Sequence, residues 1–206
     1  ESRLYVKTAF GTIHAGRFGA LEAGTGSVSI FGGDVAFGTG WGDSIMKTSN
    51  ILEGLTTRYD NSIAYQSPTF AGATLYLAHS FKNDSKSEGV EGRPTADQYN
   101  GVGLKYANGP FNAAFVASQQ NYQNTVANIK NSKAFSLTAA YNFGVCKVAA
   151  EGQYFNMGRS FVAETEKVAA HAGANNKGWG AIVSVTAPVA GGNVLASVGY
   201  KDAENI

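Results

Sequence analysis

Residues Thr57–Phe81 read TRYDNSIAYQSPTFAGATLYLAHSF, and the order of apolar and polar side chains in this stretch decides the fold. The two kinds of side chain alternate on either side of the short break Ser67–Gly72. A period of two residues places successive side chains on opposite faces of a β-strand. The stretch therefore predicts two strands joined by a tight turn, each with one apolar and one polar face. The apolar face carries Ile63, Tyr65, Ala73, Leu75 and Leu77, and the polar face carries Arg58, Asp60, Ser62, Gln66, Thr74, Tyr76 and Ser80.

The composition favours a single transmembrane β-barrel domain. The 206 residues carry 16 Lys and Arg against 15 Asp and Glu, and this net charge of +1 argues against a nucleic-acid binder. Only 15% of the residues are charged, which is low for a soluble surface. No apolar run reaches the roughly 18 residues that a transmembrane helix needs. A barrel conceals its hydrophobicity in this way, because only every second strand residue meets lipid.

The same alternation recurs in about ten segments along the chain. The connections between these segments alternate between short turns and long loops. In an up-and-down meander every second connection lies on the same rim, so the short turns share one rim and the long loops the other, as in outer-membrane barrels. The expected strands are Ser2–Phe10, Thr12–Phe18, Thr57–Ser67, Ala73–Lys82, Gln98–Ala107, Phe111–Tyr122, Lys133–Phe143, Lys147–Met157, Gly178–Pro188 and Asn193–Asp202.

Aromatic side chains concentrate near the ends of the expected strands. Phe70 and Phe143 lie near short turns, whereas Tyr99, Trp179 and Tyr200 lie nearer the long loops. Amphipathic rings favour the lipid–water interface, so two aromatic girdles are expected. The alternative is the aromatic core of a soluble β-fold, which would not place aromatic residues at both ends of most strands.

The connection Gly19–Thr56 is too long for a hairpin loop, and its composition is not that of a disordered linker. It contains the apolar stretch Ser27–Phe31 and Trp41. A loop this apolar should be buried against another surface, and in a barrel that surface is the inner wall. We therefore expect residues 19–56 to fold into the barrel.

The sequence contains no recognisable catalytic or metal-binding motif. His14, His79 and His171 lie far apart without the spacing of metal ligands. No Ser, His and carboxylate groups converge in a known catalytic pattern. Cys146 is the only cysteine, so an intramolecular disulfide cannot form. We expect a protein that is not an enzyme and needs no cofactor and no metal.

Four stretches resemble the Gram-negative general porin family, in particular its neisserial and β-proteobacterial members. They are Ser2–Val6, Phe10–Arg17, Phe31-Gly32-Gly33-Asp34 and Arg58–Gly72. The family forms homotrimers of closed barrels with about sixteen strands in the outer membrane, and its third extracellular loop narrows the pore. By this resemblance residues 1–206 form one partial barrel domain that lacks about three strands at each end, and residues 19–56 are the constriction loop.

The resemblance also assigns residues to the pore. Arg3 and Arg58 match wall arginines that face the lumen, and Lys7 lies on the same face as Arg3. The strand alternation independently turns Arg58 away from Ile63 and Tyr65. Arg17 matches an arginine that contacts a neighbouring subunit in the family. It lies four residues after Ile13 and so on the same apolar strand face, which does not favour a position in the pore.

The acidic half of the constriction is weaker than in enteric members of the family. Asp34 is retained, and Glu22 and Asp43 lie elsewhere in the loop. Lys105, with Lys147 and Lys201, lies on the polar strand faces. Because charge rings favour the counter-ion, a weak anion preference is expected. The alternative is that the lysines extend to the rims and do not affect selectivity.

Three functional hypotheses remain open at this stage. The first is a passive channel for ions and small hydrophilic solutes, surrounded by outer-membrane lipid and without a nucleic-acid partner. The second is a non-conducting outer-membrane barrel that acts as an adhesin or surface receptor. The third is a soluble, lipocalin-like binder.

About ten strands leave two unpaired sheet edges, which lipid does not tolerate. Either they close as a smaller barrel or the function belongs to a longer chain.

Overall fold

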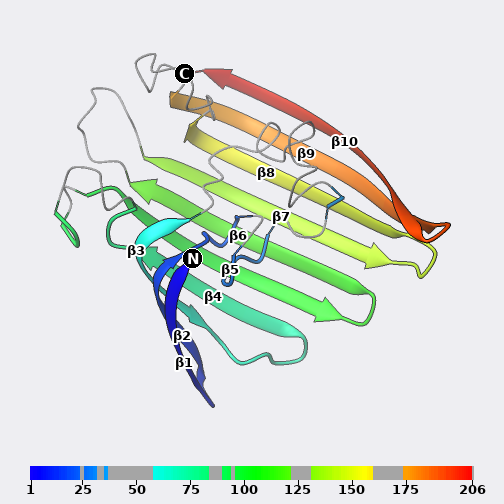
Figure 1. Ribbon diagram of the computed structural model, residues 1–206. Helices are drawn as coiled ribbons and strands as arrows, with labels where there is room; N and C mark the ends of the chain where they lie inside the picture. Colours follow the sequence, from blue (N-terminus) through cyan, green and yellow to red (C-terminus); the bar gives the residue numbers. More distant parts are fainter. Residues whose placement is uncertain are drawn as a thin grey trace.

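The computed structural model describes residues 1–23, 26–31, 35–36, 58–83, 90–93, 96–121, 131–159 and 174–205. Its regular elements form one antiparallel ten-stranded sheet in which spatial order equals chain order (Figure 1). The up-and-down meander is confirmed. The strands are β1 Ser2–Thr8, β2 Gly11–Phe18, β3 Tyr59–Gln66, β4 Ala73–Ser80, β5 Gln98–Asn108, β6 Phe111–Asn121, β7 Ser132–Asn142, β8 Lys147–Arg159, β9 Ala174–Val189 and β10 Gly192–Asn205.

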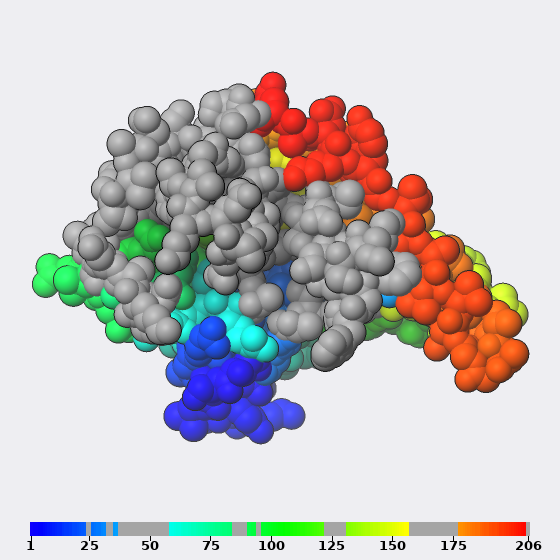
Figure 2. Space-filling view, turned by 45° about the horizontal axis from the view of Figure 1, so that its top comes forward, coloured from blue at the N-terminus to red at the C-terminus, as the bar shows by residue number. Residues whose placement is uncertain are grey.

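The sheet is curved but not closed. β1 pairs with β2 and β10 pairs with β9, and these two outer strands lie at opposite edges of the sheet (Figures 1 and 2). Of the two alternatives that the sequence left open, closure of these ten strands as a smaller barrel is therefore not observed. Within the described ranges no helix is long and apolar enough to span a membrane.

The turn between β3 and β4 explains how these two strands of the stretch Thr57–Phe81 are paired. Ala71 and Gly72 have φ values of +47° and +85°, the left-handed conformation that tight two-residue hairpin turns require. A Cβ atom at Gly72 would lie 2.5 Å from the carbonyl oxygen of Ala107 on β5, so glycine is needed there. The turn sets Tyr65 opposite Leu77 and keeps the apolar side chains of both strands on one face.

The two faces of the sheet differ in polarity, as the alternation predicts. On one face, which we call the outer face, large apolar side chains are exposed across most strands. Soluble proteins rarely expose so large a contiguous apolar patch, whereas a lipid-facing wall requires one. Examples are Ile13, Ile63, Leu75, Leu77, Val102, Leu104, Phe115, Leu137 and Val183, which are all exposed.

The opposite, inner face carries small and polar side chains and is covered by part of the connection between β2 and β3. Leu21, Val28 and Phe31 from this connection are buried against inner-face residues such as Val116 and Ile182. Full burial of each large apolar side chain contributes about 1.5–3 kcal/mol. The described residues of the connection therefore pack on the inner wall. Residues 37–57, with Asp43, and residues 32–34, with Asp34, lie outside the described part of the chain.

Candidate functional site

The candidate site is the inner face together with the described residues 19–23, 26–31 and 35–36, which we call the inner segment. The inner segment begins where β2 ends and reaches far across the sheet. The backbone N–H of Ala36 donates to Oγ of Ser184 on β9 at 2.9 Å. Gly103 on β5 makes room for it, because a Cβ atom there would lie 2.5 Å from Cδ1 of Ile30. The segment therefore crosses the inner face from β2 to β9.

A buried polar contact fixes the start of the inner segment. The hydroxyl of Tyr99 on β5 donates to Oε2 of Glu22 at 2.5 Å and accepts from the backbone N–H of Leu21 at 3.3 Å. The ring of Tyr99 lies 4.6 Å from that of Tyr59, centroid to centroid. Gln120 on β6 in turn donates to the Tyr59 hydroxyl. We call Glu22, Tyr59, Tyr99 and Gln120 the segment anchor.

Glu22 occupies a different environment from the one expected of a pore-lining charge. Only 2% of the residue is exposed. Burial raises the pKa of its carboxyl group, although hydrogen bonds from Tyr99 and Ser118 act in the opposite direction. Its carboxyl group therefore holds the inner segment to β5 and does not face open solvent. Tyr99, which the sequence placed in an aromatic girdle, is also buried on the inner face.

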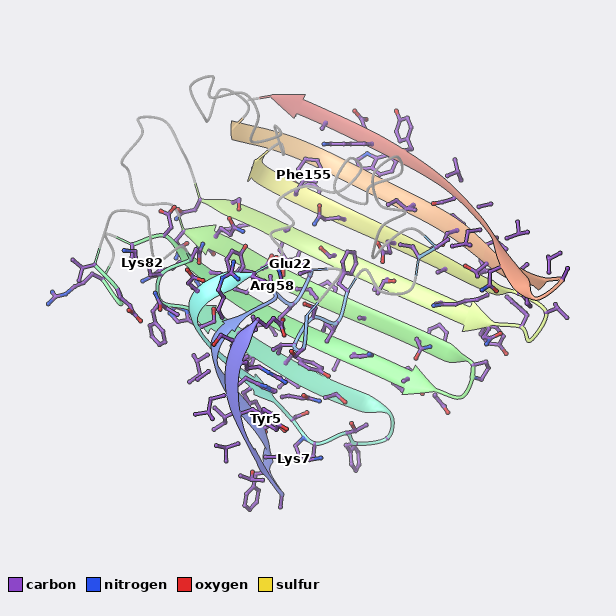
Figure 3. The ribbon with its side chains drawn as sticks, viewed as in Figure 1. Tyr5, Lys7, Glu22, Arg58, Lys82 and Phe155 are labelled. Atoms are coloured by element: carbon purple, nitrogen blue, oxygen red, sulfur yellow. The ribbon has the colours of Figure 1, made fainter. Side chains whose placement is uncertain are left out.

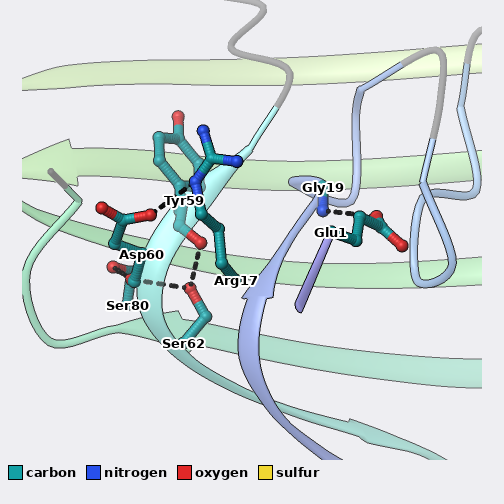
Figure 4. A network of polar contacts seen from close by, with 7 residues as sticks. All are labelled: Glu1, Arg17, Gly19, Tyr59, Asp60, Ser62 and Ser80. Atoms are coloured by element: carbon teal, nitrogen blue, oxygen red, sulfur yellow. Dashed lines mark hydrogen bonds and ion pairs between the residues drawn. The ribbon is translucent and has the colours of Figure 1, made fainter. Parts of the chain in front are cut away.

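A second contact ties the inner segment to the start of the chain. Oε1 of Glu1 accepts a hydrogen bond from the backbone N–H of Gly19 at 3.2 Å (Figure 4). It accepts a second from the backbone N–H of Ser27 at 3.1 Å. The Ser27 hydroxyl donates to the other carboxylate oxygen. Partial burial raises the pKa of Glu1, but these hydrogen bonds outweigh it and hold the pKa below its ordinary value.

Arg3 and Lys7 lie together on the inner face of β1. Their strand pairs with β2 so that Tyr5, between them, lies opposite the buried His14. Arg3 Nη1 donates to His14 Nδ1 at 2.7 Å, and its guanidinium lies 4.9 Å from the Tyr5 ring centroid. The two cations line a polar groove of about 390 Å³ that also includes Gln66. Figure 3 shows Tyr5 and Lys7 further along β1, toward the short turn.

The other strand lysines also lie on the inner face. Lys105 on β5 pairs with Thr74 on β4 and is half-buried. Lys201 on β10 pairs with Gly180, and its Nζ lies 5.6 Å from the ring centroid of Phe155. Lys147 shares the inner face of β8 with the buried Glu151. The inner face therefore carries cations on several strands, although these are not gathered at one point.

Arg58 is exposed and immediately precedes β3 (Figure 3). The alternation of outward and inward side chains that includes Ile63 and Tyr65 is interrupted before it reaches Arg58. Asn61 has a φ of +47°, and the register between β2 and β3 shifts beside it. Tyr59 is buried on the inner face as a result. The irregular strand start is held by Ser80 Oγ, which donates to the Asp60 carbonyl at 2.6 Å (Figure 4).

Arg17 forms an ion pair with Asp60. Its Nε lies 2.6 Å from Oδ1 of Asp60, while 53% of the Arg17 side chain remains exposed (Figure 4). Elsewhere in the described chain, no group of three or more His, Cys, Asp and Glu side chains is arranged to hold a metal ion.

Comparison with known proteins places this arrangement in a family. A sequence model of the family described as Gram-negative porin matches residues 1–205. An outer membrane porin protein of Bordetella pertussis is 32% identical over 164 residues, which cover 72% of this chain and 41% of the relative. The anion-selective porin from Comamonas acidovorans superposes with a TM-score of 0.64 at 20% identity, and the match covers 98% of this chain and 57% of that porin. The chain thus spans about half the length of the proteins it matches.

Proposed function

Because this chain belongs to the Gram-negative porin family, we propose that it forms part of the wall of a water-filled channel for passive diffusion of ions and small hydrophilic solutes. The protein is located in the bacterial outer membrane. One observation carries the proposal: an apolar segment is packed on a polar inner face, while the outer face is apolar. Such a wall suits lipid on one side and water on the other.

The inner segment supports a size limit for this channel. It lies across the inner face from β2 to β9 and is attached at Tyr99 and at Glu1. In a closed barrel a segment in this place reduces the open cross-section. We infer that residues 19–56 form the constriction of a single barrel domain.

The charges of the inner face support weak anion preference. Arg3 and Lys7 line an open groove, whereas the carboxyl groups of Glu22 and Glu151 are buried. Cations that remain accessible in a lumen attract anions and raise their local concentration. The same preference is named for the Comamonas porin, whose likeness to this chain concerns the fold. Asp34 and Asp43 complete the proposed set of pore-lining charges, and Arg58 belongs to it through the family resemblance alone and not through strand alternation.

Planar-bilayer recording of the intact protein tests both the proposed channel and its proposed anion preference. Stable ohmic current steps are expected, whereas a protein that inserts without conducting would support the adhesin or receptor hypothesis. The reversal potential across a KCl gradient should show weak chloride preference. A double variant Arg3→Gln/Lys7→Gln should shift that potential toward potassium, and Lys133→Gln on the outer face should not. Clear cation selectivity of the unmodified protein would contradict the proposed preference.

A further inference from the structure

A line of polar side chains crosses the outer face near the long-loop rim. Strand pairing sets His79 on β4 opposite Asn100 on β5, Asn100 opposite Gln119 on β6, and Gln119 opposite Lys133 on β7. We call these residues the outer polar row. Two positions along each strand, about 7 Å toward the short turns, the outward side chains become apolar. They are Leu77, Val102, Ala117 and Phe135, followed by Leu75, Leu104, Phe115 and Leu137.

A hollow lies directly against the outer polar row. Its volume is about 720 Å³, within the range of about 300–1,000 Å³ typical of ligand sites. Its walls include Ile63, Val102 and Phe135, and Ala117 provides a small side chain between the last two. The outer polar row lines one end of the same hollow. The site is thus apolar along its length and polar at the end nearest the long loops.

The polar end carries a positive charge. Nδ1 of His79 lies 2.9 Å from Oδ1 of Asn100, and Nε2 of Gln119 donates to Asn121 at 2.6 Å. Lys133 is exposed and forms no ion pair with any residue in the described ranges. The described outer-face carboxylates lie elsewhere: Asp60 is paired with Arg17, and Asp202 and Glu204 are on β10. The ammonium group of Lys133 is therefore available to an anion at this rim.

We propose that this hollow and the outer polar row bind a phosphorylated acyl lipid of the outer membrane. One acyl chain occupies the hollow, and a phosphate group contacts Lys133 and the amide of Asn100. A lipid without anionic phosphate would leave the lysine unmatched, and free phosphate would leave the apolar hollow empty. The proposal rests on the outer-membrane location and not on conduction.

Native mass spectrometry of the intact porin in detergent tests the site with diphosphoryl lipid A as the probe. The same glycolipid without its phosphates and inorganic phosphate form the other two arms. Diphosphoryl lipid A should bind more tightly than its dephosphorylated form. Lys133→Gln should weaken that binding about fivefold, the contribution of one basic residue near an anionic lipid surface, and Lys133→Arg should retain it.

Two matched controls distinguish binding at the hollow from lipid binding elsewhere on the outer face. Ala117→Leu should fill the hollow and weaken both glycolipids, whereas Ala113→Leu, outside the hollow on the same face of β6, should weaken neither. Lys177→Gln should have little effect, because Lys177 lies opposite Glu204.

Equal binding of the two glycolipids, or unchanged binding by Lys133→Gln, would overturn the proposal. Displacement of the lipid by inorganic phosphate would indicate an adventitious anion site and would also overturn it. Loss of oligomers in the Lys133→Gln variant, without loss of lipid, would show that a second copy covers this face and would overturn it as well. A protein that binds the lipid but does not conduct would contradict the channel proposal alone.

Discussion

The hydroxyl of Tyr99 lies 2.5 Å from Oε2 of Glu22, a residue 77 positions earlier in the chain. Both groups are buried, and the same hydroxyl accepts from the backbone N–H of Leu21. One side chain of the barrel wall thus satisfies both a carboxyl group and a backbone donor at the start of the inner segment. A buried polar group without a partner is costly, so this contact specifies where the segment leaves the wall.

Tyr99→Phe should loosen the inner segment without unfolding the barrel. The change removes the hydroxyl but keeps the ring packed against that of Tyr59. Leaving the Glu22 carboxyl group without this donor should cost about 1–3 kcal/mol of segment attachment. Single-channel recording of the intact porin should show larger current fluctuations, and limited proteolysis should cut the inner segment faster.

Tyr76→Phe is the matched control for this change. Tyr76 is also buried on the inner face, one strand away on β4, but its hydroxyl is not part of the segment anchor. Its replacement should leave current fluctuations and proteolysis unchanged. Equal effects of the two substitutions would mean that Tyr99 acts through general packing and not through Glu22.

Attachment of the inner segment should depend on pH through Glu22. Burial raises the pKa of this carboxyl group in the folded state. The folded state therefore binds the proton more tightly than the detached segment, and the stability of attachment falls as pH rises from the ordinary glutamate pKa to the raised value. Current fluctuations should accordingly increase with pH across that window. Glu22→Gln should remove the dependence, and a pH profile that persists in this variant would assign it to another group.

The strands were predictable from the sequence because their signals are local. The segment predicted at Thr57–Ser67 is β3 at Tyr59–Gln66, and alternation with adjacent turn residues is enough to define it. The segment anchor was not predicted. Tyr99 shares the polar face of its strand with Gly101 and Gly103, and this alternation could have placed Tyr99 on the inner face. Its partner Glu22 could not be predicted, because the contact depends on the path of the long connection between β2 and β3. The break at Asn61 was also missed, because a left-handed residue leaves no trace in hydrophobic periodicity.

The packing of Ile30 over Gly103 offers a test of the path of the inner segment. A methyl group at position 103 would lie 2.5 Å from Cδ1 of Ile30, so Gly103→Ala should destabilise the protein by about 1–3 kcal/mol through overpacking. Ile30→Val removes Cδ1 and should restore most of the lost stability in the double variant. Urea unfolding in lipid vesicles measures both changes. If the two effects simply add, the two side chains do not touch.

The ion pair between Arg17 and Asp60 allows the homotrimer that the family resemblance implies to be tested apart from folding. We expect Arg17 to contact a neighbouring subunit with the 53% of its side chain that stays exposed. Because about half of the Arg17 side chain stays exposed, the pair itself should contribute only about 1 kcal/mol to the protomer. Arg17→Gln, which removes the charge without placing a second carboxylate beside Asp60, should therefore leave unfolding nearly unchanged but abolish the trimer band on unheated denaturing gels. Asp60→Asn, which keeps the arginine, should preserve that band. Loss of the trimer in both variants would indicate that the pair acts by shaping β2 and β3, and retention in both would place the subunit contact elsewhere.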